Sequence, residues 1–413
     1  MKKQAKIILI ISALMLTTVA CGAFLEGDRE IVTARTPTPY EPVESPPQER
    51  IEISDYYELS AEILSLILEH ENVGLFVTYN FDIPDIQEEV DRAIEEIETY
   101  NPIGAFATSS ISAITRRTAA YTEIDVFVEF KRTQEQVNSI IPAATIRYLR
   151  TELLGVLREH RDEVAFRTSL NITEDDIRDF MKEMYYDNPR SIIMLPVVAL
   201  EAFPAYGEDR IIELRFGHIE PSSILQQYVE ILSANVRYNA GLAVGGNDAE
   251  ILLTLARNLI ASTTFDEAAA RAISDHGPQN FAATAFGALE RGNAVGEGFA
   301  MAFKALADEL GFDCRIVLGY RDGMVHAWNI VSLFGEFYHI DVAMGALYGL
   351  ENSFLKTDDD FIEMLYEWDF ENTVRCNGTL TYEDIVYLED DMRYNEIDDA
   401  IVNDDEDIIG NYN

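Results

Sequence analysis

The sequence predicts an α+β protein in which a duplicated helix-plus-strands region precedes a core of one helix packed on an antiparallel sheet. Two observations predict this class. Two segments repeat the same order of helical and alternating patterns, and a glycine-rich turn further along precedes one helix and three strands. The chain has 413 residues, 48% of them hydrophobic, so it is long enough for one large or two ordinary domains.

The charge balance excludes several classes of partner. Acidic residues outnumber basic residues 73 to 31, which gives a formal charge of −42. Binding to nucleic acid depends on clustered lysine and arginine, so no nucleic acid partner is expected. A purely electrostatic attachment to anionic lipid is excluded for the same reason. Only three cysteines are present, which excludes a small disulfide-dense scaffold.

The N-terminal residues predict export and lipid anchoring. Three lysines precede an apolar stretch, and small residues then lead to Cys21. This arrangement resembles the lipobox of bacterial lipoproteins, with Thr18 where a leucine is usual. The resemblance implies that residues 1–20 are a signal peptide and that Cys21 carries a lipid at the extracytoplasmic face of the cell membrane. Residues 21–52 are rich in proline and are expected to form a stalk.

Residues 53–219 contain the duplication, an α/β region of two units. A helix is expected over Ile86–Tyr100 in the first unit, and a helix from Glu174 is expected in the second, about 87 residues later. An Asn-Pro pair stops each helix, because the residue before proline disfavours the α conformation. Strands follow in each unit and end with an alternating run, at 124–130 and at 211–216. Repeated units of this kind favour a binding or spacer role.

The second half divides into a connector, a domain and a tail. Residues 220–246 are expected to form a helical connector between the duplicated region and a domain at 247–375. Residues 376–413 carry runs of aspartate and glutamate, which predict an acidic, solvated tail. The spacing of these acidic runs does not fit an EF-hand calcium loop.

The domain at 247–375 contains the most informative segment. A glycine-rich turn at 292–299 opens a helix from about Glu297, and Gly311 is a plausible residue to end it. Three strands are expected after this helix, at 314–320, 326–333 and 337–342. The order is therefore one helix followed by an antiparallel sheet.

Several linked motifs in this segment resemble the transglutaminase-like superfamily, whose members have a papain-like fold. The family pattern has Gly-x-Cys-x-Gly-aromatic-Ala at a helix start, a Leu-Gly helix end, a strand ending in Gly, a His-Ala-Trp-Asn strand and a strand ending Tyr-x-x-Asp. The matching residues here are Ala294 to Ala300, Leu310-Gly311, Val317 to Gly319, His326 to Asn329 and Gly335 to Asp341. The resemblance covers roughly residues 247–375.

The resemblance implies a site with one member missing. In this family a cysteine thiolate at the helix N-terminus is the nucleophile, a histidine takes its proton, and an aspartate orients the imidazole. The last two roles fall on His326 and Asp341, but the nucleophile position is Gly296, which has no side chain. The resemblance therefore implies a pseudoenzyme. The chain has no His-Glu-x-x-His or Cys-x-x-Cys motif, so neither a metal nor a cofactor is expected.

The leading expectation is that this domain binds a peptide, a protein or a cell-wall ligand, because a cleft for an extended peptide can keep its shape without its nucleophile. Two alternatives stay open. In the first alternative the protein is an active cysteine peptidase, amidase or transglutaminase-type enzyme. His326 and Asp341 then work with a displaced nucleophile such as Cys314, or His326 activates water. In the second alternative the protein is a structural spacer, in which the duplicated region at 53–219 does the work and the C-terminal domain only folds. A Cys314–Cys376 disulfide is compatible with export but is not indicated by spacing.

Overall fold

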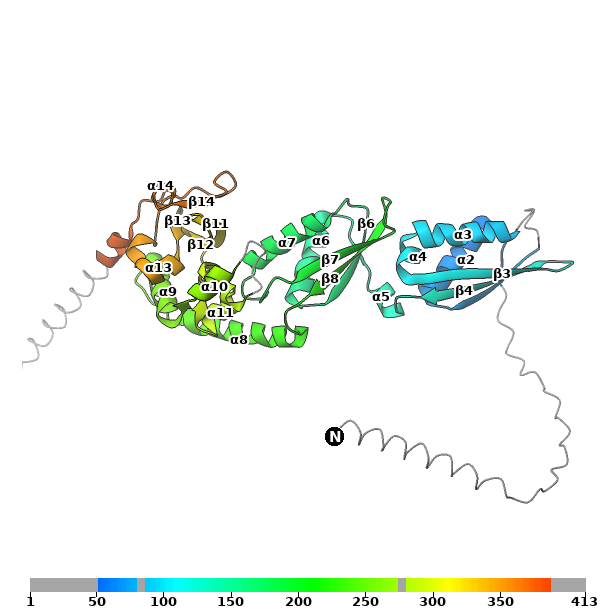
Figure 1. The fold of residues 1–413 in the computed structure, drawn as a ribbon, viewed down its shortest axis with the longest axis horizontal. Helices are drawn as coiled ribbons and strands as arrows, with labels where there is room; N and C mark the ends of the chain where they lie inside the picture. Colours follow the sequence, from blue (N-terminus) through cyan, green and yellow to red (C-terminus); the bar gives the residue numbers. More distant parts are fainter. Residues whose placement is uncertain (1–50, 80–85, 274–279, 388–413) are drawn as a thin grey trace, which may run out of the picture. The chain divides into compact units, whose positions relative to one another are not determined.

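The structure is a computed structural model that describes residues 51–79, 86–273 and 280–387 (Figure 1). The expected signal peptide, Cys21, nearly all of the stalk and the tail after residue 387 lie outside the described residues. Helices and antiparallel sheets alternate along the chain, so the expected α+β class is confirmed. Within the described residues, no helix has both the length and the apolar character needed to span a bilayer.

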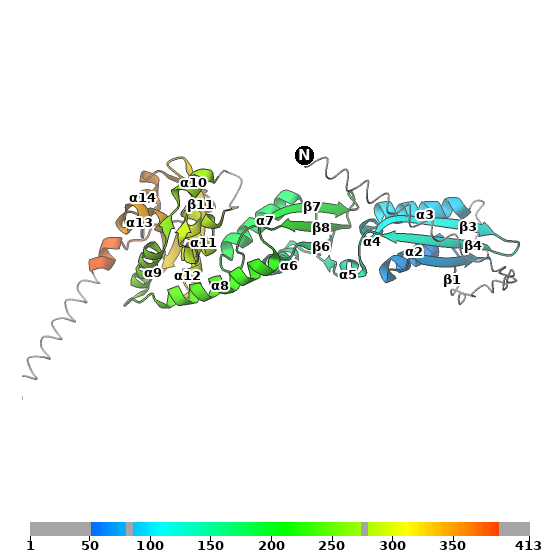
Figure 2. The same cartoon turned by 60° about the horizontal axis from the view of Figure 1, so that its bottom comes forward.

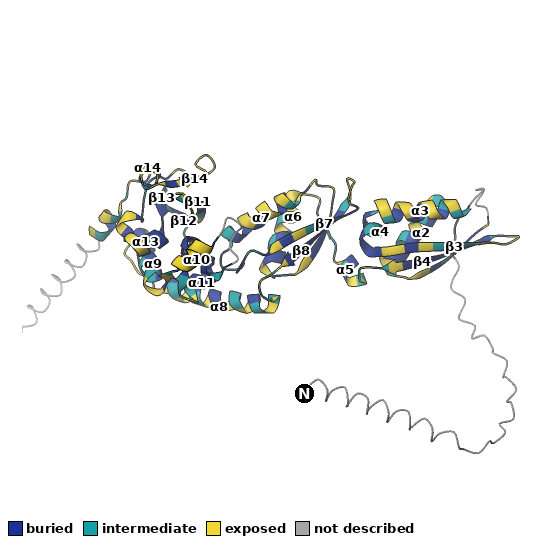
Figure 3. Cartoon of the chain, in the orientation of Figure 1, coloured by how far each residue is buried: buried dark blue, intermediate teal, exposed yellow. Residues whose placement is uncertain are grey.

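The first unit of the duplicated region is a four-stranded sheet covered by helices α2 and α3, with the short helix α4 packed against both (Figure 1). Its sheet order is β1-β2-β4-β3, with β1 parallel to β2 and the other pairs antiparallel. Figure 3 shows the outward face of α3 exposed and its inward face buried. The elements are β1 (Ile51–Glu52), α2 (Tyr56–Glu69), β2 (Val73–Thr78), α3 (Ile86–Tyr100), α4 (Pro102–Ala107), β3 (Thr108–Arg117) and β4 (Thr122–Phe130).

The second unit repeats this arrangement. Its sheet order is β5-β6-β8-β7, again with the first pair parallel and the other pairs antiparallel. A short helix, α5 (Gln134–Asn138), joins the two units. The elements of the second unit are β5 (Ile141–Pro142), α6 (Ile146–Arg158), β6 (Glu163–Thr168), α7 (Glu174–Asp187), β7 (Val197–Phe203) and β8 (Arg210–Gly217).

Local sequence explains where the helices of these units begin and end. The Asp55 carboxylate accepts hydrogen bonds from the backbone N–H groups at the start of α2, and Thr145 caps α6 in the same way. Helices α3 and α7 end at Tyr100 and Asp187, just before the Asn-Pro pairs. The sequence analysis did not identify α2, α4 and α6, so the first unit has two more helices than expected and the second unit has one more.

A run of helices follows the duplicated region and leads into the core domain. The first is α8 (Ser222–Gly241), which packs against the central helix of the domain, α12 (Gly296–Glu309). Between them lie α9 (Asp248–Ser262), β9 (Thr264–Phe265), α10 (Glu267–Ala272), the 3-10 helix η1 (Phe281–Ala283), α11 (Ala285–Leu289) and β10 (Asn293–Ala294). The short strands β9 and β10 pair with each other in parallel.

The core domain is helix α12 packed on a four-stranded sheet in the order β13-β12-β11-β14 (Figure 2). Buried residues surround α12 on nearly all sides. The Asn329 side chain joins the two layers, because its Nδ2 donates to the Ala300 carbonyl at 3.0 Å. The remaining elements are β11 (Cys314–Arg321), β12 (Met324–Leu333), β13 (Glu336–Ile340), α13 (Val342–Tyr348), the 3-10 helix η2 (Leu350–Asn352), α14 (Asp358–Glu363) and β14 (Tyr366–Trp368).

The first residues of the expected acidic tail belong to this domain. Cys376 and Ile385 are each only 1% exposed and lie in the same hydrophobic core as α12. The Tyr338 hydroxyl accepts a hydrogen bond from the Leu380 backbone N–H at 3.2 Å. Residues 376–387 therefore pack on the domain instead of being solvated, and the acidic runs that suggested a tail all begin beyond them.

Candidate functional site

Two tight hairpins fix the position of His326. Asp322-Gly323 connects β11 to β12, and Phe334-Gly335 connects β12 to β13, with all four residues at φ between 50° and 87°. Two-residue loops with positive φ at both positions are type I′ turns, which match the twist of antiparallel strands. The resulting register pairs Gly319 with His326.

The structure brings His326 and Asp341 together. His326 lies near the start of β12, and Asp341 follows the end of β13. The His326 Nε2 is 2.6 Å from Asp341 Oδ2, and the Tyr366 hydroxyl donates to the same oxygen at 2.8 Å. The other carboxylate oxygen accepts from the Met344 backbone N–H at 2.9 Å, which caps α13. Asp341 is therefore held on both oxygens and positions the imidazole.

The electrostatics of Asp341 determine which ring nitrogen is available. Burial alone would raise the pKa of this carboxyl, but the charge of His326 and the hydrogen bonds from His326, Met344 and Tyr366 outweigh burial and lower the pKa. Asp341 is therefore ionised at neutral pH and accepts a hydrogen bond from the Nε2–H group of His326. The opposite nitrogen, Nδ1, is left to face the start of α12.

Gly296 lies at the start of α12, directly against that imidazole. A Cβ atom added to Gly296 would lie 2.5 Å from both Nδ1 and Cε1 of His326. The residue before it, Val295, provides no side-chain hydrogen bond to the helix start. The helix dipole and the N–H groups of the first turn therefore point at the place where a thiolate would lie. The His326 ring therefore occupies the space that a side chain at position 296 would take.

A carboxylate next to this position connects the site to the duplicated region. Glu297 follows Gly296, and its Oε1 accepts a hydrogen bond at 2.7 Å from the hydroxyl of Tyr186 at the end of α7. Burial raises the pKa of Glu297 to about 7, although the Tyr186 hydrogen bond lowers it in part. At the other end of α12, Glu309 forms an ion pair with Arg190. The second unit of the duplication therefore contacts both ends of α12.

A buried chain of hydrogen bonds lies behind the site. The Trp328 indole N–H donates to Nδ1 of His339 at 3.0 Å, and Nε2 of His339 lies 3.0 Å from Asp358 Oδ1. Burial lowers the pKa of His339, so the ring is neutral. Because Nδ1 accepts from Trp328, the single ring proton is on Nε2 and is donated to Asp358.

His339 and Asp358, together with Cys376, form the one cluster in the described part of the chain with spacing suited to a metal ion. The ligand atoms of His339, Asp358 and Cys376 lie within 4.8 Å of one another. A metal at Nε2 of His339 would displace the proton donated to Asp358, while Trp328 already occupies the other nitrogen. Burial raises the pKa of the Cys376 thiol to about 12, so this sulfur carries its proton in the metal-free protein. In this structure the three residues are part of a hydrogen-bond network, in which the Cys376 backbone N–H also donates to Asp358 Oδ1 at 3.2 Å.

Cys314 lies far from the imidazole. It pairs with Val331 on β12, whereas His326 pairs with Gly319, so five strand residues separate the two positions. At the rise of a β-strand this is roughly 17 Å. Burial raises the pKa of the Cys314 thiol well above its usual range, and nearby Lys304 offsets this only in part. Cys314 and Cys376 are both free, so the structure does not contain the disulfide.

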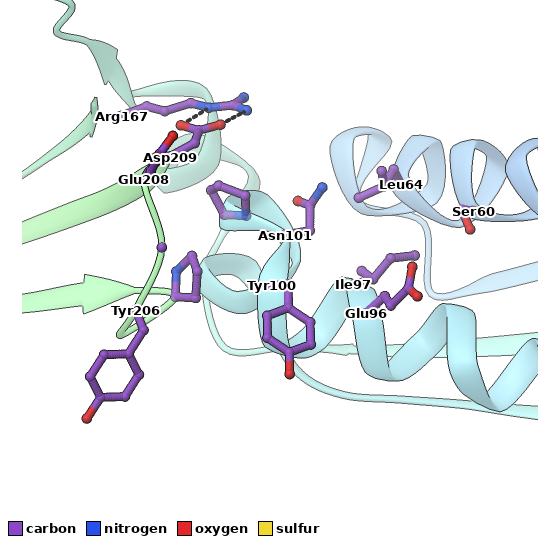
Figure 4. A pocket seen from close by; sticks show the side chains of 13 residues that line it. Ser60, Leu64, Glu96, Ile97, Tyr100, Asn101, Arg167, Tyr206, Glu208 and Asp209 are labelled. Atoms are coloured by element: carbon purple, nitrogen blue, oxygen red, sulfur yellow. Dashed lines mark hydrogen bonds and ion pairs between the residues drawn. The ribbon is translucent and has the colours of Figure 1, made fainter. Parts of the chain in front are cut away.

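A hollow on the described residues lies elsewhere. It has a volume of about 690 Å³ and is lined by residues of both units of the duplicated region, including Tyr100 and Tyr206 (Figure 4). The Arg167 guanidinium in its wall is already bound to both carboxylate oxygens of Asp209, at 2.7 and 3.2 Å. Its lining includes no residue of the core domain, so this hollow is separate from the His326 site.

Sequence reasoning missed two residues that complete the site. Tyr366 donates a hydrogen bond to Asp341, which lies 25 residues earlier in the sequence. Tyr186 donates a hydrogen bond to Glu297, which lies 111 residues later. Glu297 itself falls inside the matched helix-start motif, and its place next to Gly296 was the available signal. No local pattern marks either tyrosine as a site residue.

The comparison with protein families agrees with the fold of this domain. Residues 235–342 match the family model of the Transglutaminase-like superfamily. No curated protein matches the chain. The similar solved structures include a TGase at 13% sequence identity, with 52% of this chain and 60% of that chain covered and a TM-score of 0.26. This chain therefore spans only about three fifths of that structure.

Two further solved structures are similar to this chain. One is a candidate cysteine protease from Cytophaga hutchinsonii, at 14% identity, with 36% of this chain and 62% of that chain covered and a TM-score of 0.22. The other is a candidate protease from Parabacteroides distasonis, at 8% identity, with coverages of 65% and 39% and a TM-score of 0.20. On the family match and the observed core, the chain contains a transglutaminase-like domain.

Proposed function

We propose that the transglutaminase-like domain binds a peptide, protein or cell-wall ligand without covalent catalysis. The observation that supports this most strongly is the helix start at Gly296, where the His326 ring fills the place of a nucleophilic side chain. Glycine offers no atom that can attack a carbonyl carbon. The imidazole and the buried Asp341 carboxylate remain in position, so the site keeps polar groups that can hold a ligand.

An active enzyme with a displaced nucleophile is the alternative, and the position of Cys314 opposes it. A nucleophile must lie within hydrogen-bond reach of its base, and Cys314 is five strand residues from the level of His326. It also lies near the C-terminal turns of α12, where the Lys304 ammonium binds its backbone carbonyl at 2.6 Å. The helix dipole at that end disfavours a thiolate.

The proposal extends to location. A signal peptide at 1–20 and a lipid on Cys21 would tether the protein to the extracytoplasmic face of a bacterial membrane, with a proline-rich stalk before the folded part. Support for this part comes from the sequence alone. Metabolic labelling with a radioactive fatty acid tests it, since the label should be lost in a Cys21→Ala variant.

The binding proposal predicts a specific loss. The full chain, purified in mild detergent, is expected to bind purified bacterial cell wall saturably, and His326→Ala should weaken this binding about tenfold, the loss expected for one or two hydrogen bonds. His218→Ala is the matched control, because this half-buried histidine follows β8 in the second unit, away from β12, and its Nε2 lies 3.0 Å from the Arg161 carbonyl. Sedimentation with wall material measures both.

Two outcomes would contradict the proposal. One is no saturable binding of the unmodified protein to wall material or to purified peptides. The other is release of cleaved or cross-linked products that requires His326, which would restore the enzyme alternative.

A further inference from the structure

A second charged group lies on the same sheet as His326. Arg321 is the last residue of β11 and pairs with Met324 on β12 and with Tyr366 on β14. Side chains two residues apart on a strand point to the same face, about 7 Å apart. Arg321 is therefore two positions from Gly319, the residue paired with His326, and lies on the same face of the sheet.

Aromatic rings of the site flank this arginine. The Arg321 guanidinium carbon lies 5.5 Å from the ring centroid of Tyr366 and 5.4 Å from that of Tyr348. The Tyr366 hydroxyl donates to Asp341, the carboxylate that positions His326. Tyr348 is 60% exposed, so the arginine lies at the edge of the domain where a ligand can reach it.

Arg321 has no carboxylate partner within 4 Å among the described residues, although the chain contains 73 acidic residues. Its Nε is buried and has no hydrogen-bond partner. Arg315, on the same strand, differs because Asp313 binds it at 2.9 Å. The buried Nε cannot reach a ligand from outside, so the donors open to a ligand are the terminal N–H groups of the guanidinium, which lie beside the Tyr366 side chain.

We propose that Arg321 binds a carboxylate of a peptide ligand and holds that peptide beside His326. The planar guanidinium presents N–H donors in a fork that matches the two oxygens of a carboxylate. A single arginine also neutralises the single charge of a carboxylate, which is the anion best suited to so acidic a protein. This inference rests on the proposed function and adds the chemical class that the site recognises.

The test uses a synthetic wall-type pentapeptide, acetyl-Ala-Glu-Lys-Ala-Ala with D residues at Glu and the last two Ala, and the full chain in mild detergent. Titration calorimetry compares the peptide acid with its C-terminal amide and with the peptide in which Gln replaces Glu. Arg321→Gln should weaken binding of the acid roughly 10- to 100-fold, as expected for a charge-assisted hydrogen bond. With the unmodified protein, either the amide or the Gln peptide should show the same loss of affinity. The peptide that shows this loss identifies which carboxylate of the ligand Arg321 binds.

Two variants control this test. Arg315 lies on the same strand as Arg321 but already has an acidic partner, Asp313. Arg315→Gln should therefore leave the affinity for the peptide unchanged. Arg321→Lys keeps the charge without the fork and should recover part of the loss. Thermal melting checks that each variant is folded.

The outcomes separate this inference from the proposed function. Equal affinity of the acid and both uncharged peptides, or no effect of Arg321→Gln, would overturn the carboxylate site, while His326-dependent wall binding would still stand. Absence of any peptide or wall binding by the unmodified protein would overturn both.

Discussion

A cysteine placed at position 296 is expected to react as a thiolate at mildly acidic pH. The Gly296→Cys side chain would lie at the N-terminus of α12 and next to Nδ1 of His326. A helix N-terminus and a neighbouring imidazolium lower a thiol pKa into a range of about 3.5–7.5, from about 8.5 for a free cysteine. The midpoint of iodoacetamide labelling against pH should fall in that lower range.

The substitution also has a steric cost. The added Cβ would overlap the imidazole at 2.5 Å, so the His326 ring must move away from α12 while Asp341 restrains Nε2. Overpacking of this kind costs about 1–3 kcal/mol of stability. The melting temperature of Gly296→Cys should therefore fall, and labelling should be read well below the melting transition.

Two controls make the labelling result specific. In Gly296→Cys with His326→Ala, the midpoint should rise because only the helix dipole still lowers the thiol pKa. Gly241→Cys places a thiol at the last residue of α8 in open space, where an ordinary or raised pKa is expected. A labelling midpoint at or above about 8.5 in Gly296→Cys, equal to that of Gly241→Cys, would show that the preserved site geometry is wrong.

Glu297→Gln is expected to change how stability depends on pH. The pKa of Glu297 is raised from 4.5 to about 7 in the folded protein, chiefly by burial, so folding favours the neutral carboxyl. The stability that the neutral Glu297 carboxyl contributes is fully present below about pH 4.5 and is lost as pH rises through about 7. Above that window the ionised carboxylate costs roughly 3 kcal/mol.

Glutamine stays neutral at every pH, and its amide oxygen can still accept the Tyr186 hydrogen bond. The variant should match the unmodified protein near pH 4.5 and exceed it by roughly 3 kcal/mol near pH 8, in urea unfolding at both pH values. Tyr186→Phe provides an independent check. The Tyr186 hydrogen bond lowers the pKa of Glu297, so its loss should raise that pKa and extend the pH range of the stability change to higher pH. A stability difference that is constant from pH 4 to 8 would contradict the assignment.

Much of the core domain could be predicted from the sequence because its elements are marked locally. The alternating residues of β11, β12 and β13 and the glycines at their turns gave strand bounds within about two residues of the structure. The His-Ala-Trp-Asn segment identified His326 through the family resemblance, and the structure places its ring against Gly296 as that resemblance implies.

The unpredicted parts depend on contacts between distant residues or on weak local signals. Strand β14 has only three residues, too few for an alternating pattern, yet it supplies Tyr366 to the site. Helix α2 did carry a signal that was not used, since Asp55 can cap it and Leu59, Ile63 and Leu66 line one face. The hydrogen bond between Tyr186 and Glu297 joins residues 111 positions apart, which no spacing rule predicts.

Site-resolved iodoacetamide labelling of the unmodified chain tests the central claim most directly, since that claim is the absence of an activated thiol near His326. Burial raises the pKa of both Cys314 and Cys376, so we expect slow labelling of each at every pH up to about 9, with no change in His326→Ala. Rapid labelling of Cys314 near pH ~6, slowed by His326→Ala, would contradict the account and show that the nucleophile has moved.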